Sequence, residues 1–367
     1  MTNVDVVLMR NSERAKFRRC MLAWDWSYNR RLAPPRSKGA LTFGTMIHDA
    51  LEIRYPPGRK RGPHPAGTFA KLFDAQSETF DQWDEEGNRV PARELGIAML
   101  EGYVELYGED EDIEILQPEI PMQVDVYDRH ENYLCTWVGK GDAAYKYLPT
   151  GRKGFLEHKT AKSIPEEVMV ISGYGDQGIA YFWASDFVFR QRGWLEDGEY
   201  LDHVKYNWLR KALQDDRPKN ADGLALNKPK KEALLDAVVE RGLNPPRRAT
   251  VEALTAILER EGVEVALLGE ISKIQPKPLF HRFTMDLFPG QMNNFNERIR
   301  QEAWLMRQAR AGRIPILKNP TKDCSWDCEF KEACELHSMG GDFEASLELE
   351  FGTWDPYSDH EIFEEKL

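Results

Sequence analysis

Long apolar stretches are missing from this chain of 367 residues. No run of 18 apolar residues occurs, so we expect no membrane-spanning helix and no membrane partner. The opening residues, MTNVDVVLMRNSERAKF, lack the apolar core of a secretory signal peptide. These absences predict a cytoplasmic protein.

A nucleotide-binding loop of the form G-x4-GK[ST] is also missing, which excludes a P-loop motor that moves along DNA by hydrolysing ATP. Positive charge is scarce overall, since the net charge is −12. It is unevenly spread: residues 1–61 hold thirteen Lys and Arg against five acids, whereas residues 341–367 hold nine acids and one lysine. A local basic surface is enough to bind phosphates, and we assign Arg18 and Arg19 to such a surface.

Cysteine is rare, and three of the five cysteines fall within CSWDCEFKEAC at residues 324–334. In a reducing compartment, clustered thiols indicate metal ligands rather than disulfides. A closed tetrahedral site needs a fourth thiol, from Cys20 or Cys135. Cys135 lies in the apolar strand YLCTW, where a buried free cysteine is the simplest interpretation. Zinc and an iron–sulfur cluster both accept four thiolates.

Hydrophobic periodicity divides the chain into segments. Residues 1–113 are predicted to be a helical region, and alternation with turns at RHEN and PTGRKG predicts a three-stranded meander near 114–160. A helix follows, completing a core at 114–204. Residues 205–280 are predicted to be a partly helical insertion, residues 281–340 a long helix with the cysteine cluster, and residues 341–367 an acidic tail.

The meander carries the clearest chemistry. A turn near 149–152 places Asp142 opposite Glu157, and Lys159 shares a strand face with Glu157. Facing carboxylates repel, and a divalent cation between them reverses that repulsion. The backbone carbonyl of His158 is a further possible oxygen ligand, and such hard ligands suit Mg²⁺ or Mn²⁺. An ordinary surface ion pair is the other interpretation of a Glu-x-Lys pattern.

Three further features accompany the carboxylates. Gly139 and Gly141 flank Lys140 and allow the strand to bend before Asp142. His48, on a predicted helix, is either a metal ligand or a structural residue. Gln177 and Tyr181 are four apart on the helix after the meander and therefore share a face.

In order, Gly44-x3-His48, Gly139-x2-Asp142, Glu157-x-Lys159 and Gln177-x3-Tyr181 resemble the RecB-like branch of the PD-(D/E)XK nuclease superfamily. A lone N-terminal cysteine with three C-terminal cysteines resembles the iron–sulfur exonucleases of that branch, which occur with CRISPR adaptation modules, in AddB-type helicase–nucleases and in phages. The first gap of the C-terminal triplet is three residues here, where that branch commonly has two.

The resemblance implies an α/β, or α+β, fold with a restriction-endonuclease-like core: a central mixed sheet flanked by helices, with helical N- and C-terminal parts clasped by a metal cluster. It implies that His48, Asp142 and Glu157 bind the catalytic Mg²⁺ or Mn²⁺, with Lys159 stabilising charge. Gln177 and Tyr181 would hold the DNA strand. Cys20, Cys324, Cys328 and Cys334 would bind a [4Fe–4S] cluster, with zinc as the alternative.

The function expected from these features is a metal-dependent DNA exonuclease acting on single-stranded ends, in a bacterium or in a phage-infected host. One alternative is an end-trimming nuclease subunit of a CRISPR-adaptation or recombination complex. Another is a non-catalytic iron–sulfur DNA-binding protein. The acidic tail is either a solvated segment or a docking peptide for a protein partner.

Overall fold

A computed structural model describes residues 6–34, 40–76, 79–83, 88–164, 175–199, 201, 203–286, 288–358 and 360. The chain divides into two compact units, of which the main unit comprises Met1–Lys211 and Phe280–Leu367. The inserted unit comprises Ala212–Leu279. Within the described ranges, none of the helices combines the length and the apolar character needed to cross a membrane.

A mixed sheet forms the centre of the main unit. Its three long strands are β5 (Ile113–Tyr127), β6 (Tyr133–Tyr147) and β7 (Lys153–Ala161), which follow one another as an antiparallel meander. Next to β7 lies β8 (His203–Arg210) in parallel, and then β9 (Phe280–Asp286) in antiparallel orientation. The two-residue strand β1 (Leu8–Met9) pairs in parallel with β6. The predicted mixed α/β class is thereby confirmed.

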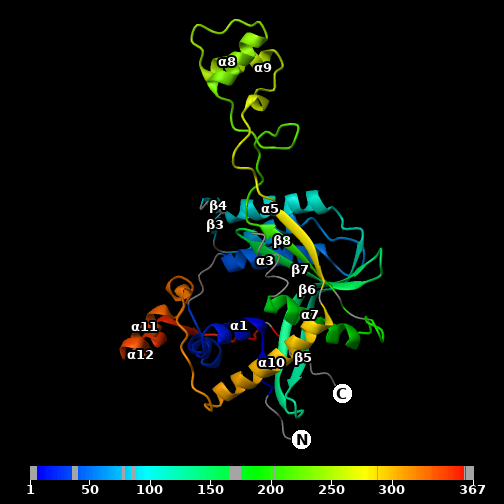
Figure 1. The fold of residues 1–367 in the computed structure, drawn as a ribbon, viewed down its shortest axis with the longest axis vertical. Coiled ribbons are helices and arrows are strands. Elements are labelled where there is room, and N and C mark those ends of the chain that lie inside the picture. Colours follow the sequence, from blue (N-terminus) through cyan, green and yellow to red (C-terminus); the bar gives the residue numbers. More distant parts are fainter. Residues whose placement is uncertain are drawn as a thin grey trace. The chain divides into compact units, whose positions relative to one another are not determined.

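Helices flank the sheet on both faces (Figure 1). Three lie on one side: α3 (Ala40–Arg54), α4 (Pro65–Asp74) and α5 (Ala92–Tyr107). On the other side lie α7 (Asp176–Gln191) and α10 (Pro289–Arg310). Alternation along β7 serves both cores, because Phe155 packs into the α7 core and Leu156 into the α3–α5 core. A small hairpin, β3 (Asp81–Trp83) with β4 (Arg89–Pro91), precedes α5.

The two ends of the chain pack against each other in the main unit. The N-terminal part forms α1 (Asn11–Arg19), α2 (Met21–Trp24), a π-helical turn η1 (Asp25–Asn29) and β2 (Leu32–Ala33). The C-terminal part forms η3 (Lys322–Ser325), α11 (Lys331–Met339), α12 (Phe343–Glu350) and β10 (Gly352–Thr353). Trp26 packs in one cluster with Phe330 and Leu347. Figure 1 shows α1 on the same side of the molecule as α11 and α12.

Two predicted boundaries differ from the structure. The expected start of the insertion, residue 205, falls inside strand β8. This strand carries polar residues but is buried on both faces, and the separate unit begins only at Ala212. The expected acidic tail, 341–367, contains α12 and β10, since Phe343, Leu347 and Phe351 supply an apolar face that packs on the N-terminal part. Residues 361–367 of that tail lie outside the described residues.

The inserted unit contains two helices, α8 (Lys231–Glu240) and α9 (Val251–Arg260), and a 3₁₀ turn, η2 (Val265–Leu268). Its helices bury a small core of Leu234, Ala237, Val238, Leu254 and Leu258. Thr250 caps α9 by accepting a hydrogen bond from the backbone N–H of Ala253 at 3.2 Å. This unit therefore has a hydrophobic core of its own.

Candidate active site

Asp142 and Glu157 lie where two strands of the sheet separate. The ladder between β6 and β7 runs up to the pair Ala143 and Leu156, so the next positions, 142 and 157, face each other just beyond it. There the side chain of Asp142 replaces a ladder bond, because its Oδ2 accepts the backbone N–H of His158. The sequence prediction that these two carboxylates face each other matches this register.

The close packing next to Asp142 depends on the glycine before it. A Cβ atom on Gly141 would lie 2.0 Å from two ring atoms of Phe155. The aromatic ring therefore occupies the space that any other side chain would need, and it can do so because β6 carries no side chain there. Phe155 lies on the same strand as Glu157, so this close approach brings the two carboxylate-bearing strands together.

The two carboxylates are held in different electrostatic states. Burial alone would raise the pKa of Asp142, but His48, at 3.1 Å between its Nδ1 and Asp142 Oδ1, outweighs burial and holds that pKa well below its usual range. Burial raises the pKa of Glu157 to about 7, with Lys159 opposing and Asp142 adding to the rise. Asp142 is therefore the stable anion. At Glu157 the nearby positive charge does not compensate for burial, so its carboxylate is the less stable of the two.

Glu157 and Lys159 form an ion pair on one face of β7, with the Lys159 ammonium on Glu157 Oε1. Burial disfavours the charged ammonium, but Glu157 and Asp142 outweigh it and hold the pKa of Lys159 above its ordinary value. The other carboxylate oxygen, Oε2, is buried and has no hydrogen-bond partner. A side chain only 4% exposed, with an orphan anionic oxygen, is a costly arrangement unless a cation completes it.

His48 reaches the carboxylates from α3. The helix carries it to Asp142, 94 residues further along the chain, and its ring lies edge-on to that of His158 with centroids 6.2 Å apart. Burial lowers the pKa of His48, but Asp142 raises it by more, so the imidazole is biased towards its charged form. The neutral imidazole would add a nitrogen ligand beside the Asp142 carboxylate, so a cation bound there would displace the imidazole proton.

A cleft of about 920 Å³ opens over these residues. Its walls include six of the eight candidate side chains, namely His48, Asp142, Glu157, Lys159, Gln177 and Tyr181, but not Arg18 or Arg19. Gln177 Nε2 donates to the Tyr181 hydroxyl at 3.2 Å along one face of α7. Burial raises the pKa of Tyr181 to about 12, so its phenol is a neutral donor at physiological pH. The motif residues that are spread over 134 positions of sequence therefore share one cleft.

Sequence reasoning missed several residues of the cleft. Glu119 lies opposite Asp142 on the neighbouring strand, because Ile120 pairs with Gly141, and its carboxylate holds the Lys140 ammonium. Pairing the first two strands of the meander would have revealed it. The N-terminus of α1 (Arg10, Asn11 and Ser12), together with Lys211, also lines the cleft. No local signal in the sequence places these residues there.

The two arginines predicted to bind DNA are both engaged by carboxylates. Arg18 pairs with Asp176, a cleft residue, and with Glu302 at 3.0 Å. Arg19 pairs with Asp327 at 2.7 Å. The cationic side chains that line the cleft itself are Arg10, Lys140, Lys159 and Lys211.

The donor set of the cleft fits a divalent cation in its chemistry. Two facing carboxylates, one with an orphan oxygen, and an imidazole are ligands that Mg²⁺ and Mn²⁺ accept. As these side chains are placed, no group of three or more His, Cys, Asp or Glu in the described part of the chain is gathered tightly enough to hold a metal ion. The expectation for the His158 carbonyl stays a prediction.

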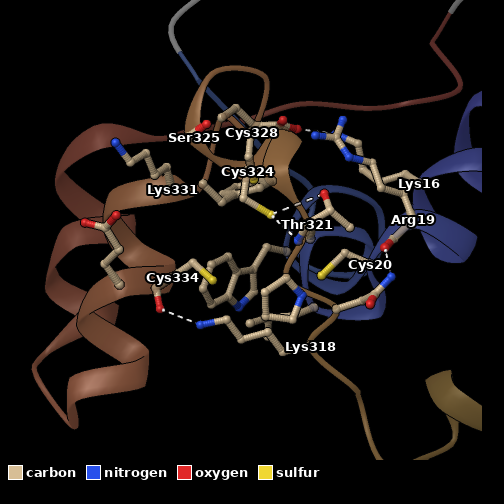
Figure 2. A pocket seen from close by; sticks show the side chains of 18 of the residues that line it. Lys16, Arg19, Cys20, Lys318, Thr321, Cys324, Ser325, Cys328, Lys331 and Cys334 are labelled. Atoms are coloured by element: carbon tan, nitrogen blue, oxygen red, sulfur yellow. Dashed lines mark hydrogen bonds and ion pairs between the residues drawn. The ribbon is translucent and has the colours of Figure 1, made fainter.

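A second pocket, of about 460 Å³, is lined by four of the five cysteines. Cys20 lies between α1 and α2, Cys324 in η3, Cys328 in the loop that follows and Cys334 in α11. Figure 2 shows the sulfurs of Cys20, Cys324 and Cys334 turned towards the space between them. Cys135 is separate from this group, buried on β6 with 3% of its surface exposed, as the sequence predicted.

The surroundings of this pocket suit negatively charged sulfur. The backbone N–H of Thr321 donates to Cys324 Sγ at 3.3 Å and lowers the pKa of that thiol. At Cys328 burial acts in the opposite direction and raises the pKa of the thiol. Lys16, Arg19, Lys318, Lys322 and Lys331 lie around the pocket. Basic side chains and backbone donors around four thiols fit a thiolate-bound metal centre in their chemistry.

Comparison with known proteins assigns no family. No family model matches the chain, and no curated protein matches it in sequence. One solved structure with some likeness is that of a presumed exonuclease from Eubacterium rectale, at 11% sequence identity and a TM-score of 0.43, with 86% of each chain covered.

Proposed function

We propose that the protein is a divalent-metal-dependent DNA nuclease that acts on single-stranded ends. The observation that carries this proposal is the buried Glu157 carboxylate, whose Oε2 has no partner although it faces Asp142 and an open cleft. A bound cation would satisfy this oxygen and would offset the repulsion between the two facing carboxylates.

The residues of the cleft would have different roles in phosphodiester hydrolysis. Asp142 and Glu157, with His48, would hold Mg²⁺ or Mn²⁺, which when bound polarises a phosphate oxygen and activates water. Lys159 keeps its proton and so would present a fixed positive charge to the oxygens of the pentacoordinate phosphorus, where negative charge develops. Gln177 and Tyr181 supply neutral donors, and Arg10, Lys140 and Lys211 supply cations for flanking phosphates.

Substitution of the Glu157–Lys159 pair tests this proposal. Glu157→Gln and Lys159→Ala should each lower Mn²⁺-dependent release of nucleotides from end-labelled single-stranded DNA by about 100-fold or more. The matched control is the surface pair Lys153–Glu199, at 3.1 Å, which starts on the same strand but lies outside the cleft. Lys153→Ala and Glu199→Gln should leave the activity unchanged. A wild-type protein that degrades no DNA end with Mn²⁺ would contradict the proposal.

We further propose that Cys20, Cys324, Cys328 and Cys334 hold a structural [4Fe–4S] cluster that joins the two ends of the chain. Support comes from the four thiols lining one pocket and from the basic side chains around it. The cluster would add a covalent connection to a region that already packs through Trp26, Phe330 and Leu347.

Iron content tests the cluster. Protein purified without oxygen should be brown and hold about four iron atoms per chain, and Cys20→Ser should lose most of them. Cys135→Ala should keep them, because that thiol lies on β6 away from the pocket. A colourless wild-type protein with one zinc ion would show that the site is a zinc site.

A further inference from the structure

His158, between Glu157 and Lys159, is held on both sides of its strand. On one side its backbone N–H donates to Asp142 Oδ2, beyond the end of the β6–β7 ladder. On the other side it pairs with Asn207 in the parallel ladder to β8, and its Nδ1 lies 2.8 Å from Asn207 Nδ2. Because the β6 ladder has already ended, the Asp142 contact joins β7 to β6 at this point, and the Asn207 contacts join β7 to β8.

The orientation of the Asn207 amide is settled by its other neighbours. Arg282, on β9, carries only hydrogen-bond donors, and its Nε lies 3.4 Å from Asn207 Oδ1. The amide oxygen must therefore face Arg282, and the NH₂ group faces His158 and the Tyr103 hydroxyl, which lies 3.0 Å away. It follows that His158 Nδ1 is an acceptor and that the ring carries its proton on Nε2.

This arrangement belongs to a larger buried network. The Tyr103 hydroxyl lies 2.5 Å from that of Tyr55, which donates to Asp110 at 2.5 Å, and Arg282 donates to Asp110 and Tyr103. The Tyr55 ring stacks on the ring of His158 with centroids 5.8 Å apart. Asn207 is fully buried and Tyr103 nearly so. Since Tyr55 follows α3, the network also joins the strand of Glu157 to the helix of His48.

We propose that Asn207 is a positioning residue for the carboxylate pair: by donating to His158 it fixes the Nε2-protonated ring and so sets the place of β7 relative to Asp142. The inference rests on the proposed metal-dependent function of the same cleft. The amide of Asn207 thus meets complementary atoms on His158, Tyr103 and Arg282, and His158 lies between Glu157 and Lys159.

Two substitutions at Asn207 separate positioning from stability. Asn207→Asp is isosteric and replaces the donor by an acceptor, so the His158 proton should move to Nδ1. Asn207→Leu removes the interaction altogether. Both should weaken Mn²⁺ binding, measured by calorimetry, by about 10- to 100-fold, the range typical of residues that orient metal ligands. Tyr103→Phe, which removes the acceptor of the other amide hydrogen, should weaken it less.

The direct readout is the imidazole nitrogen spectrum of protein labelled with ¹⁵N-histidine, in which His158→Gln identifies the signal. The wild type should show an Nε2-protonated ring and Asn207→Asp an Nδ1-protonated ring. Tyr107→Phe is the matched control. Tyr107 lies on α5 with Tyr103, and its ring centre lies 3.7 Å from the guanidinium carbon of Arg282. This substitution should change neither the tautomer nor the Mn²⁺ affinity.

An unchanged His158 tautomer in Asn207→Asp, or unchanged Mn²⁺ affinity in both Asn207 variants, would overturn the inference. Its failure is distinguishable from failure of the proposed function. If the wild type cuts no DNA while Mn²⁺ binding and the tautomer still respond to Asn207, the nuclease proposal fails and the positioning role stands. If the wild type cuts DNA and neither Asn207 variant changes Mn²⁺ binding or the tautomer, the positioning role fails and the nuclease proposal stands.

Discussion

At the scale of single residues, Gly141 decides whether Asp142 can lie in the cleft. A Cβ at this position would meet the Phe155 ring at 2.0 Å and Met122 Cε at 3.2 Å. Neither neighbour has room to withdraw, because both belong to the core on the α7 side of the sheet.

Gly141→Ala should therefore destabilise the protein by about 1–3 kcal/mol, as overpacking of a core does. Because Phe155 and Asp142 lie on the paired strands, the substitution should also weaken Mn²⁺ binding. Gly67→Ala is the control of opposite sign, since a Cβ on Gly67, in α4, would meet no atom within 4 Å, and a helical alanine adds about 0.5–1 kcal/mol. Urea unfolding measures both, and equal effects of the two alanines would contradict the packing argument.

Cys135 gives a second residue-scale prediction, in its dependence on pH. Burial, with Glu13 adding to it, raises the pKa of this thiol to about 12, against about 8.5 in an unfolded chain. The folded protein thus binds the proton more tightly than the unfolded chain does. The stability that comes from this thiol is full below pH about 8.5 and is lost as the pH rises towards 12.

The wild type should therefore exceed Cys135→Ala in unfolding free energy by about 2 kcal/mol less at pH 10 than at pH 8. Urea titrations at the two pH values measure this difference. Val138→Ala, a truncation of another buried side chain on β6, should show a cost that does not change with pH. A Cys135→Ala cost that is constant over this range would show that the thiol ionises equally in both states.

At the scale of elements, α1 is held in place by residues from the other end of the chain. Its buried Glu13 accepts hydrogen bonds from Trp24 Nε1 at 2.9 Å, from Arg310 and from the Tyr357 hydroxyl. The same hydroxyl lies 3.0 Å from the carbonyl of Leu8, and the ring lies under the guanidinium of Arg10. Since Arg10, Asn11 and Ser12 line the cleft, Tyr357 contributes to the shape of one of its walls.

Tyr357→Phe should cost about 1–3 kcal/mol of unfolding free energy, because it leaves a buried carboxylate with one donor fewer. Tyr127→Phe is the comparison: Tyr127 is 43% exposed and its hydroxyl makes only a 3.4 Å contact with Asp125. It should cost no more than a few tenths of a kcal/mol. Equal costs for the two would mean that the C-terminal segment does not secure α1.

The meander and helix α3 show which parts of the fold a local sequence pattern can predict. The meander was predictable because alternation and turn residues fix which positions of neighbouring strands face each other, and this places Asp142 opposite Glu157. The approach of α3 to that meander was not predictable from spacing. Apolar residues of α3 pack on Ala143, Leu156 and Leu209, and Tyr55, Tyr103 and Asn207, which are up to 152 positions apart, meet in one buried network beside them.

At the scale of the whole molecule, the chain leaves the sheet after β8 and returns to it at β9. The two strands are antiparallel neighbours, with Leu209 paired to Phe280, so the inserted unit of residues 212–279 begins and ends at one point of the sheet. Its buried helix residues form a cluster among themselves. A short hairpin loop can join two such strands.

Replacement of residues 212–279 by a five-residue Gly- and Asn-containing loop should therefore leave the main unit folded, with its unfolding free energy changed by less than about 1 kcal/mol. Circular dichroism should show the loss of α8 and α9 alone. Mn²⁺ binding should be retained, because none of the candidate ligands lies in the deleted segment. An insoluble or unfolded product would show that the main unit depends on the inserted one.

The sequence by itself determined the three-stranded meander, the facing carboxylates, the shared strand face of Glu157 and Lys159 and the burial of Cys135, because strand alternation and tight turns act over a few residues. It also singled out the residues that share the cleft, through their order and spacing. Only the tertiary structure decided that Glu119, Lys211 and the start of α1 join the cleft, that Arg18 and Arg19 are held by carboxylates, and that Asn207 holds His158. Those contacts depend on how helices and strands pack across more than a hundred residues, and no local pattern encodes that packing.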